Sequence, residues 1–204
     1  MIGIIDYGMG NLYSVQNALK KLNVSYQLVS TPEQVFTCDK LILPGVGAFK
    51  DCMKNLNQQN LVSAIQQAVR EKHIPLMGIC LGMQVLFEDS SEKGMSKGLG
   101  LIEGHVRKME QEGLRVPHMG WNQLVPNQDC SLFDGRLENN YVYFVHSYFA
   151  GDIKDENLIA YAQYGDYKVP GIVAGKHVFG TQFHPEKSGE DGMRILQYFV
   201  EEWV

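Results

Sequence analysis

The strongest structural signal in this sequence lies in residues 74–84. An apolar run typical of a buried strand ends at Cys80, and Gly78 and Gly82 stand two residues to either side of it. A strand that turns sharply into a helix at Gly-x-nucleophile-x-Gly forms a nucleophile elbow, and glycines are needed because side chains there would collide with neighbouring elements. The segment therefore predicts a strand, a sharp turn at Cys80 and a short helix whose buried side includes residues 85–87.

The first 90 residues alternate between apolar strands and amphipathic helices. Strands are expected at residues 2–5, 24–29, 40–44 and 74–79, and a helix after the first strand places Leu12, Val15, Leu19 and Leu22 on one face. This alternation predicts a parallel sheet with helices on both faces and right-handed crossovers. Residues 99–183 change to short β-like runs broken by Gly, Pro and Asn, and the chain ends in a helix. We expect an α/β fold of three layers, with a mostly parallel central sheet and an added antiparallel portion.

Composition narrows the partners and the compartment. The 204 residues carry a net charge of −5, which makes nucleic acid or an anionic membrane surface an improbable main partner. Four cysteines without a Cys-x-x-Cys pair do not form a zinc ribbon or a disulfide scaffold. Neither a targeting segment nor an apolar run of membrane-spanning length is visible. A reduced cytoplasmic protein is expected.

Two nucleotide-binding motifs fail on inspection. Gly8-x-Gly10 follows a strand, but the third glycine of a dinucleotide loop would fall at Tyr13. A Gly-Lys-Ser/Thr sequence, which a P-loop requires, follows none of the glycine-rich loops.

A cysteine nucleophile needs a base, and the base needs a group that orients it. Of six histidines, His184 stands at the end of an apolar strand in His184-Pro185-Glu186, where Pro185 favours extended geometry for the residue before it. A bend at Pro185 would let Glu186 reach the far ring nitrogen and fix the tautomer. With Cys80 at a second strand end of the same sheet edge, the three residues form a candidate triad.

Acyl transfer also requires an oxyanion hole. The backbone N–H of Leu81, directly after the nucleophile, is one candidate donor. The second is expected from residues 45–47, a Gly-Val-Gly segment at another strand end, where glycines allow the backbone to approach a developing oxyanion.

These residues resemble the triad, or class I, glutamine amidotransferases. Four further segments narrow the resemblance to the glutamine amidotransferase subunits of imidazole glycerol phosphate synthase, as does Phe-Val-His-Ser-Tyr at 144–148. The four segments lie at residues 6–12, 44–49, 118–122 and 184–188. The resemblance implies a single amidotransferase domain over residues 1–204.

The family implies a reaction and a partner. Cys80 would attack the side-chain amide of L-glutamine, and His184, oriented by Glu186, would carry the proton to the leaving ammonia. The ammonia would pass to a cyclase subunit with a (β/α)8 barrel, in a heterodimer that makes imidazole glycerol phosphate and aminoimidazole carboxamide ribotide in histidine biosynthesis. The resemblance implies no cofactor and no metal.

It also implies roles for individual residues. Gln84, Glu92, Ser147 and Tyr148 would hold the α-amino and carboxylate end of glutamine, although Glu88 or Asp89 could replace Glu92. The N–H of Val46 or Gly47 would complete the oxyanion hole after a partner-dependent reorientation. Partner-facing positions would be Asn11, His118, Met119, Trp121, Asn122, Tyr143 and Lys187.

Three other interpretations of the function fit the sequence less well. The anthranilate synthase amidotransferases favour a histidine within the elbow, where this chain has Met83. Cysteine peptidases and chaperone-like relatives with the same elbow lack the His-Pro-Glu spacing and the glutamine-holding set. A non-catalytic binding module would be expected to have lost a member of the triad.

Overall fold

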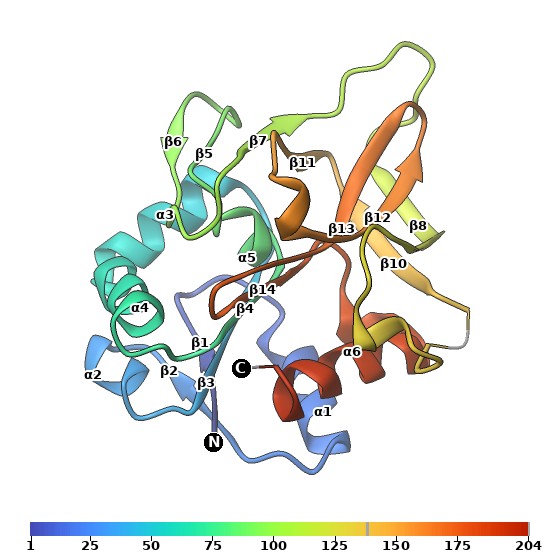
Figure 1. The fold of residues 1–204 in the computed structure, drawn as a ribbon. Helices are drawn as coiled ribbons and strands as arrows, with labels where there is room; N and C mark the ends of the chain where they lie inside the picture. The colour runs from blue at the N-terminus through green and yellow to red at the C-terminus, as the bar shows by residue number, and fades with distance from the viewer. Residues whose placement is uncertain (138, 204) are drawn as a thin grey trace.

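The computed structural model describes residues 1–137 and 139–203 (Figure 1). Its largest sheet is built from β1 (Ile2–Ile5), β2 (Tyr26–Val29), β3 (Lys40–Gly45), β4 (Leu76–Cys80), β9 (Val125–Pro126), β12 (Leu158–Tyr164), β13 (Tyr167–Gly175) and β14 (Val178–Thr181). The strand order is β2-β1-β3-β4-β14-β13-β12-β9. The neighbours from β2 to β14 pair in parallel, and those from β14 to β9 pair antiparallel. The expected mostly parallel sheet with an antiparallel portion is therefore confirmed.

Each face of this sheet is covered by a separate layer. One layer holds α2 (Pro32–Val35), α3 (Phe49–Gln58), α4 (Leu61–Arg70), α5 (Leu81–Gln84) and a small sheet of β11 (Tyr148–Gly151), β7 (His105–Lys108), β5 (Asp89–Ser90) and β6 (Ser96–Lys97). The other holds α1 (Leu12–Lys21), α6 (Gly189–Glu201) and the antiparallel pair of β8 (His118–Gln123) and β10 (Tyr141–His146). The described residues also contain the 3-10 turns η1 (Ser131–Phe133), η2 (Asp155–Asn157) and η3 (Pro185–Lys187).

The two layers follow from the alternation of side chains along the strands. In β3, Leu41 and Leu43 pack into the cluster beneath α3 and α4, whereas Ile42 between them packs into the cluster beneath α1 and α6. Successive side chains of a strand point to opposite faces, so a fully apolar strand contributes to both cores. All three of these side chains are completely buried.

The elements differ from the sequence prediction at two places that matter for the site. The helix after Cys80 ends at Gln84, and residues 85–87, although fully buried, lie beyond it. The amides of Leu86 and Phe87 bond to carbonyls three residues back, which continues the chain in turns. Strand β14 ends at Thr181, so Gln182 and Phe183 form a buried link between the strand and His184.

Two kinds of structure are absent from the part of the chain described. In residues 1–137 and 139–203, helices that are long and apolar enough to cross a membrane are absent. The same residues contain no group of three His, Cys, Asp or Glu side chains placed to hold a metal ion.

Candidate active site

The turn at Cys80 has the geometry of a nucleophile elbow. Cys80 has φ 55° and ψ −110°, a conformation that non-glycine residues rarely adopt, and it joins the last position of β4 to the first of α5. A Cβ at Gly78 would lie 2.5 Å from the carbonyl oxygen of Gly82, and one at Gly82 would overlap the carbonyl oxygen of Leu43. Only glycine fits at either place, as the sequence predicted for this motif.

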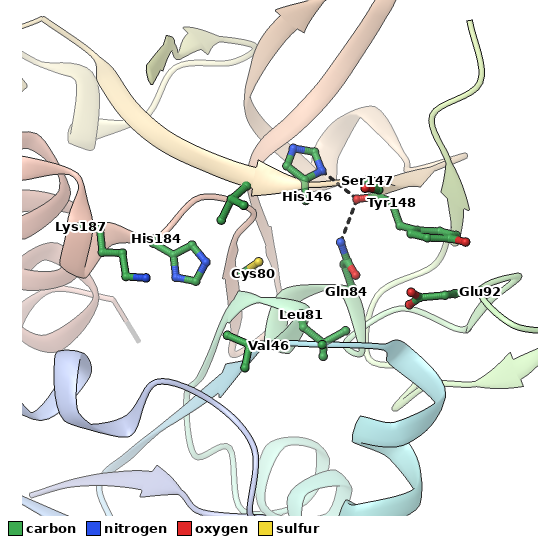
Figure 2. Close-up of a pocket in the computed structure, with 12 residues that line it drawn as sticks. Val46, Cys80, Leu81, Gln84, Glu92, His146, Ser147, Tyr148, His184 and Lys187 are labelled. Carbon is green, nitrogen blue, oxygen red and sulfur yellow. Dashed lines mark hydrogen bonds between the residues drawn. The ribbon is translucent and has the colours of Figure 1, made fainter. Parts of the chain in front are cut away.

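The structure brings Cys80, His184 and Glu186 together. His184 Nδ1 lies 2.8 Å from Glu186 Oε1, with both side chains at most 4% exposed. Figure 2 shows the Cys80 sulfur beside the His184 imidazole, and the interaction between them is among the causes that raise the pKa of His184. The segment that carries His184 is fixed because Ser188 Oγ donates to the His184 carbonyl and accepts the amide of Tyr143.

The charge state of His184 is set by its two partners. Burial acts to lower the pKa of its imidazole, but the hydrogen bonds to Cys80 and Glu186 and their charges outweigh burial and raise the pKa to about 10. His184 is therefore an imidazolium at neutral pH. Glu186 Oε2 is buried without a hydrogen-bond partner, so the imidazolium is the group that compensates the carboxylate.

Cys80 and His184 face a pocket of about 390 Å³ (Figure 2). Its walls are Val46, Gly47, Cys80, Leu81, Gln84, Glu92, Val145, His146, Ser147, Tyr148, His184 and Lys187. The volume suits a small molecule, and in Figure 2 the Cys80 thiol lies between His184 and Lys187 on one side and Gln84 and Glu92 on the other.

The four residues expected to hold glutamine all line this pocket. Gln84 donates both N–H bonds of its amide, to the Tyr148 carbonyl at 2.8 Å and to Gln182 Oε1 at 3.0 Å. Its own carbonyl oxygen Oε1 is thus left to accept a hydrogen bond from a molecule in the pocket.

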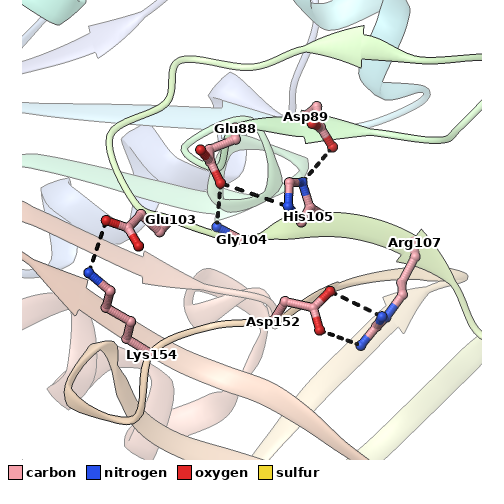
Figure 3. A network of polar contacts seen from close by, with 8 residues as sticks. All are labelled: Glu88, Asp89, Glu103, Gly104, His105, Arg107, Asp152 and Lys154. Carbon is pink, nitrogen blue, oxygen red and sulfur yellow. Dashed lines mark hydrogen bonds and ion pairs between the residues drawn. The ribbon is translucent and has the colours of Figure 1, made fainter.

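Among the three acids left open by the sequence, Glu92 is the one on the pocket wall. Its Oε2 accepts the amide of Phe49, the first residue of α3, at 2.8 Å. Glu88 and Asp89 instead belong to a network on the β5–β7 edge, where Glu88 accepts the Gly104 amide and Asp89 bonds to His105 Nδ1 at 2.9 Å (Figure 3).

The candidate oxyanion donors directly follow the ends of two adjacent strands, β3 and β4. Gly45 pairs with Cys80 in the β3–β4 register, which places Val46 and Gly47 directly beside the elbow. Gly47 has φ +95° and Val46 is 42% exposed. Leu81 follows the nucleophile at the start of α5.

The positions expected to face a partner are divided between surface and interior. Met119 and Trp121 are each 56% exposed on β8, and Trp121 contacts the ring of Tyr143 on β10. His118, on the same strand, is only 2% exposed and bonds to His146 and Asn122. Asn11 caps α1 through the Ser14 amide, and Lys187 lines the pocket.

Sequence reasoning missed two residues of this site. Gln182 points its amide nitrogen at the Cys80 sulfur, at 3.8 Å, and Ser188 fixes the His184 backbone. Both lie in the segment from which the sequence predicted only His184 and Glu186. The signal that could have found Gln182 is a polar residue inside an otherwise apolar run that leads to the base.

The buried histidines predict a loss of stability in mild acid. Burial lowers the pKa of His118 to about 4 and that of His146 to about 3. Between pH 6.5 and these values the unfolded chain binds protons that the folded chain does not, so stability falls as pH drops below 6.5. Each histidine contributes up to about 1.4 kcal/mol per pH unit in this window. Urea unfolding at pH 7.5, 6.5 and 5.5 measures the effect.

The control for that experiment is His105→Gln. The hydrogen bond to Asp89 raises the pKa of this exposed histidine. The contribution of His105 to folding stability is therefore fully present below pH 6.5 and is lost as the pH rises. The variant should keep the loss of stability below pH 6.5. A free energy of unfolding that stays constant from pH 7.5 to 5.5 would contradict the assignment of two neutral buried histidines.

Comparison with known proteins then identifies the family. Residues 3–203 match the family model described as glutamine amidotransferase class-I. A protein of Bacillus velezensis described as imidazole glycerol phosphate synthase subunit HisH is 49% identical over 98% of this chain and 95% of its own length. The HisH protein of Bacillus subtilis is 47% identical over 98% and 95%. The chain belongs to the HisH family of class-I glutamine amidotransferases. The resemblance drawn from the elbow and the His-Pro-Glu segment is thereby confirmed.

Two solved structures share the fold of this HisH chain. A glutamine amidotransferase crystal structure superposes with a TM-score of 0.77 at 22% identity, covering 98% of this chain and 97% of that one. A chain of the PurLQS structure from Thermotoga maritima gives 0.75 at 19% identity, covering 98% and 96%. At these identities the likeness concerns the fold alone.

Proposed function

We propose that this HisH chain hydrolyses L-glutamine to glutamate and ammonia with Cys80 as the nucleophile. The observation that carries the proposal is one pocket that joins the Cys80 thiol, the His184 ring and a polar wall containing Gln84 and Glu92, with Glu186 bonded to the far side of that ring. In the first step His184 holds the proton of Cys80, and the sulfur attacks the amide carbon of glutamine as a thiolate. The developing oxyanion is stabilised by the N–H of Leu81 and by that of Val46 or Gly47.

The His184 imidazolium then donates its proton from Nε2 to the leaving ammonia, which leaves a thioester on Cys80. Acylation removes the charge of the Cys80 thiolate beside His184, and the interaction with Cys80 is among the causes that raise the pKa of this histidine. The pKa of His184 consequently falls, and the neutral ring can take a proton from the water that attacks the thioester. One histidine thus serves as acid in the first step and as base in the second, with Glu186 fixing its tautomer throughout.

Glutamine would lie along the polar wall of the pocket. Glu92 supplies a carboxylate for the α-ammonium group, and the free Oε1 of Gln84 accepts a second N–H. Ser147 and Tyr148 border the carboxylate end of the substrate. This placement puts the side-chain amide of glutamine against Cys80.

The ammonia would be used by a cyclase subunit with a (β/α)8 barrel in a heterodimer, in the synthesis of imidazole glycerol phosphate and aminoimidazole carboxamide ribotide. The exposed Met119 and Trp121 support a contact surface on the β8–β10 pair, to which Asn122 and Tyr143 also belong. Asn11, Lys187 and the buried His118 complete the proposed interface region, with His118 acting from beneath the surface.

Glutamine hydrolysis by the purified chain, alone and with its cyclase, tests this function. We expect weak activity alone and stimulation of about 10²-fold or more by the ligand-bound cyclase, the contribution of one oxyanion donor brought into place. The cyclase without its ligand is the control. Full activity of the chain by itself would exclude the partner-dependent oxyanion hole, and no activity under any condition would contradict the proposed hydrolysis.

A further inference from the structure

A connected series of buried hydrogen bonds links β8 to Cys80, and the donor and acceptor of each bond can be worked out group by group. His146 Nδ1 lies 2.8 Å from the carbonyl oxygen of Tyr148. A carbonyl only accepts, so Nδ1 carries the proton. His146 is neutral because burial lowers its pKa to about 3, and Nε2 therefore has a free lone pair.

His118 stands opposite His146 in the β8–β10 register and donates to that lone pair, with Nδ1 3.0 Å from His146 Nε2. The other nitrogen of the neutral His118 ring accepts from the amide of Asn122 at 3.1 Å. The ring is also stacked between Phe144 and Tyr164. Both histidines thus have a single tautomer and a fixed orientation.

The chain continues from the Tyr148 carbonyl toward the thiol. This oxygen accepts the Gln84 amide as well as His146, and the second N–H of Gln84 goes to Gln182 Oε1. A flip of the Gln84 amide would set two oxygens against each other, so its orientation is determined, and so is that of Gln182. The amide nitrogen of Gln182 is left to donate to Cys80 Sγ at 3.8 Å.

We propose that Gln182 is a further catalytic residue, which donates a hydrogen bond to the Cys80 sulfur. This inference rests on the proposed function, in which Cys80 is the nucleophile. His146 and His118 are positioning residues, which hold this donor through Tyr148 and Gln84. A hydrogen bond to a charged acceptor is stronger than one to a neutral acceptor, so the Gln182 amide favours the thiolate over the thiol.

A purely structural network makes a different prediction. Gln182 is completely buried, and its loss would lower stability in either case. Only a donor to the sulfur also changes the ionisation of Cys80. The pH at which Cys80 becomes reactive therefore separates the two roles.

The test is the pH profile of Cys80 alkylation by iodoacetamide in the isolated chain, followed on the Cys80 peptide by mass spectrometry. Gln182→Met keeps the length of the side chain and removes the N–H. We expect the midpoint of the profile to rise by about one pH unit, a tenfold weaker preference for the thiolate. The matched control is Thr181→Val, since Thr181 is the neighbouring residue in the sequence and its buried hydroxyl has no hydrogen-bond partner.

The other ionisable groups around the sulfur are the same in the wild type, Gln182→Met and Thr181→Val. They are His184 with Glu186 behind it, Tyr7 beneath the elbow, and Glu92 and Lys187 on the pocket wall. A difference between Gln182→Met and Thr181→Val therefore reports the amide donor.

A second pair of variants tests the positioning residues and does not depend on whether Gln182→Met folds. His146→Leu removes the donor to Tyr148, and His146→Asn retains an amide nitrogen near the place of Nδ1. We expect His146→Leu to raise the midpoint by about half a unit, less than the direct donor does, and His146→Asn to restore it. A wild-type profile for folded Gln182→Met, or equal profiles for the two His146 variants, would overturn the proposal. Because alkylation does not involve glutamine, this outcome is distinct from a failure of the proposed hydrolysis.

Discussion

Replacing Cys80 with alanine is expected to reduce the kcat of glutamine hydrolysis by about 10⁴–10⁶-fold, the scale on which removal of a nucleophile acts in other triads. The thioester cannot form without the sulfur, and water would have to attack the amide directly. The pocket, the oxyanion donors and the polar wall all remain, so a small residual rate over the uncatalysed reaction is expected. The measurement is glutamate release with the ligand-bound cyclase present, at saturating glutamine.

Cys52→Ala is the matched control for that variant. Cys52 is also buried, but burial raises the pKa of its thiol to about 12, and it lies on α3 outside the pocket wall. Its loss should leave kcat close to the wild-type value. Unchanged hydrolysis by Cys80→Ala, or equal losses in the two variants, would show that the nucleophile lies elsewhere.

The elbow and the His184–Glu186 contact could be predicted from sequence because both are encoded locally. The elbow requires glycines within two residues of Cys80, and the proline between His184 and Glu186 shapes the bend that lets the carboxylate reach the ring. Short-range geometry of this kind leaves a pattern in the chain. The parallel sheet was predictable for a similar reason, since each strand–helix unit carries its own periodicity.

The groups that the sequence did not reveal depend on contacts between distant segments. The donors to the Tyr148 carbonyl come from β10 and α5, and Gln182 meets Gln84 across 98 residues of chain. The choice of Glu92 over Glu88 and Asp89 likewise depends on where the β5–β6 turn is placed against α3. Such positions carry no periodicity, and single residue types do not distinguish them.

Gly82→Ala is expected to have the second-largest effect. A methyl group there would overlap the carbonyl oxygen of Leu43, a backbone atom in the middle of the sheet. Overpacking of a core commonly costs about 1–3 kcal/mol, and a clash with backbone belongs at the upper end of this range or beyond. We expect a lower urea midpoint and, because a displacement of about 1 Å can reduce a rate 10²-fold, a fall in kcat of at least that size.

The control for Gly82→Ala is Gly175→Ala, in β13. A Cβ at Gly175 meets its nearest atom, Ile102 Cγ1, at 3.6 Å, which is an ordinary contact. Wild-type stability and kcat in Gly82→Ala would contradict the close approach of α5 and β3. The clash can be relieved only if α5 or β3 moves. The proposed oxyanion donors would move with them, because Leu81 begins α5 and residues 46–47 directly follow β3. Activity should therefore be lost even in that fraction of Gly82→Ala molecules that folds.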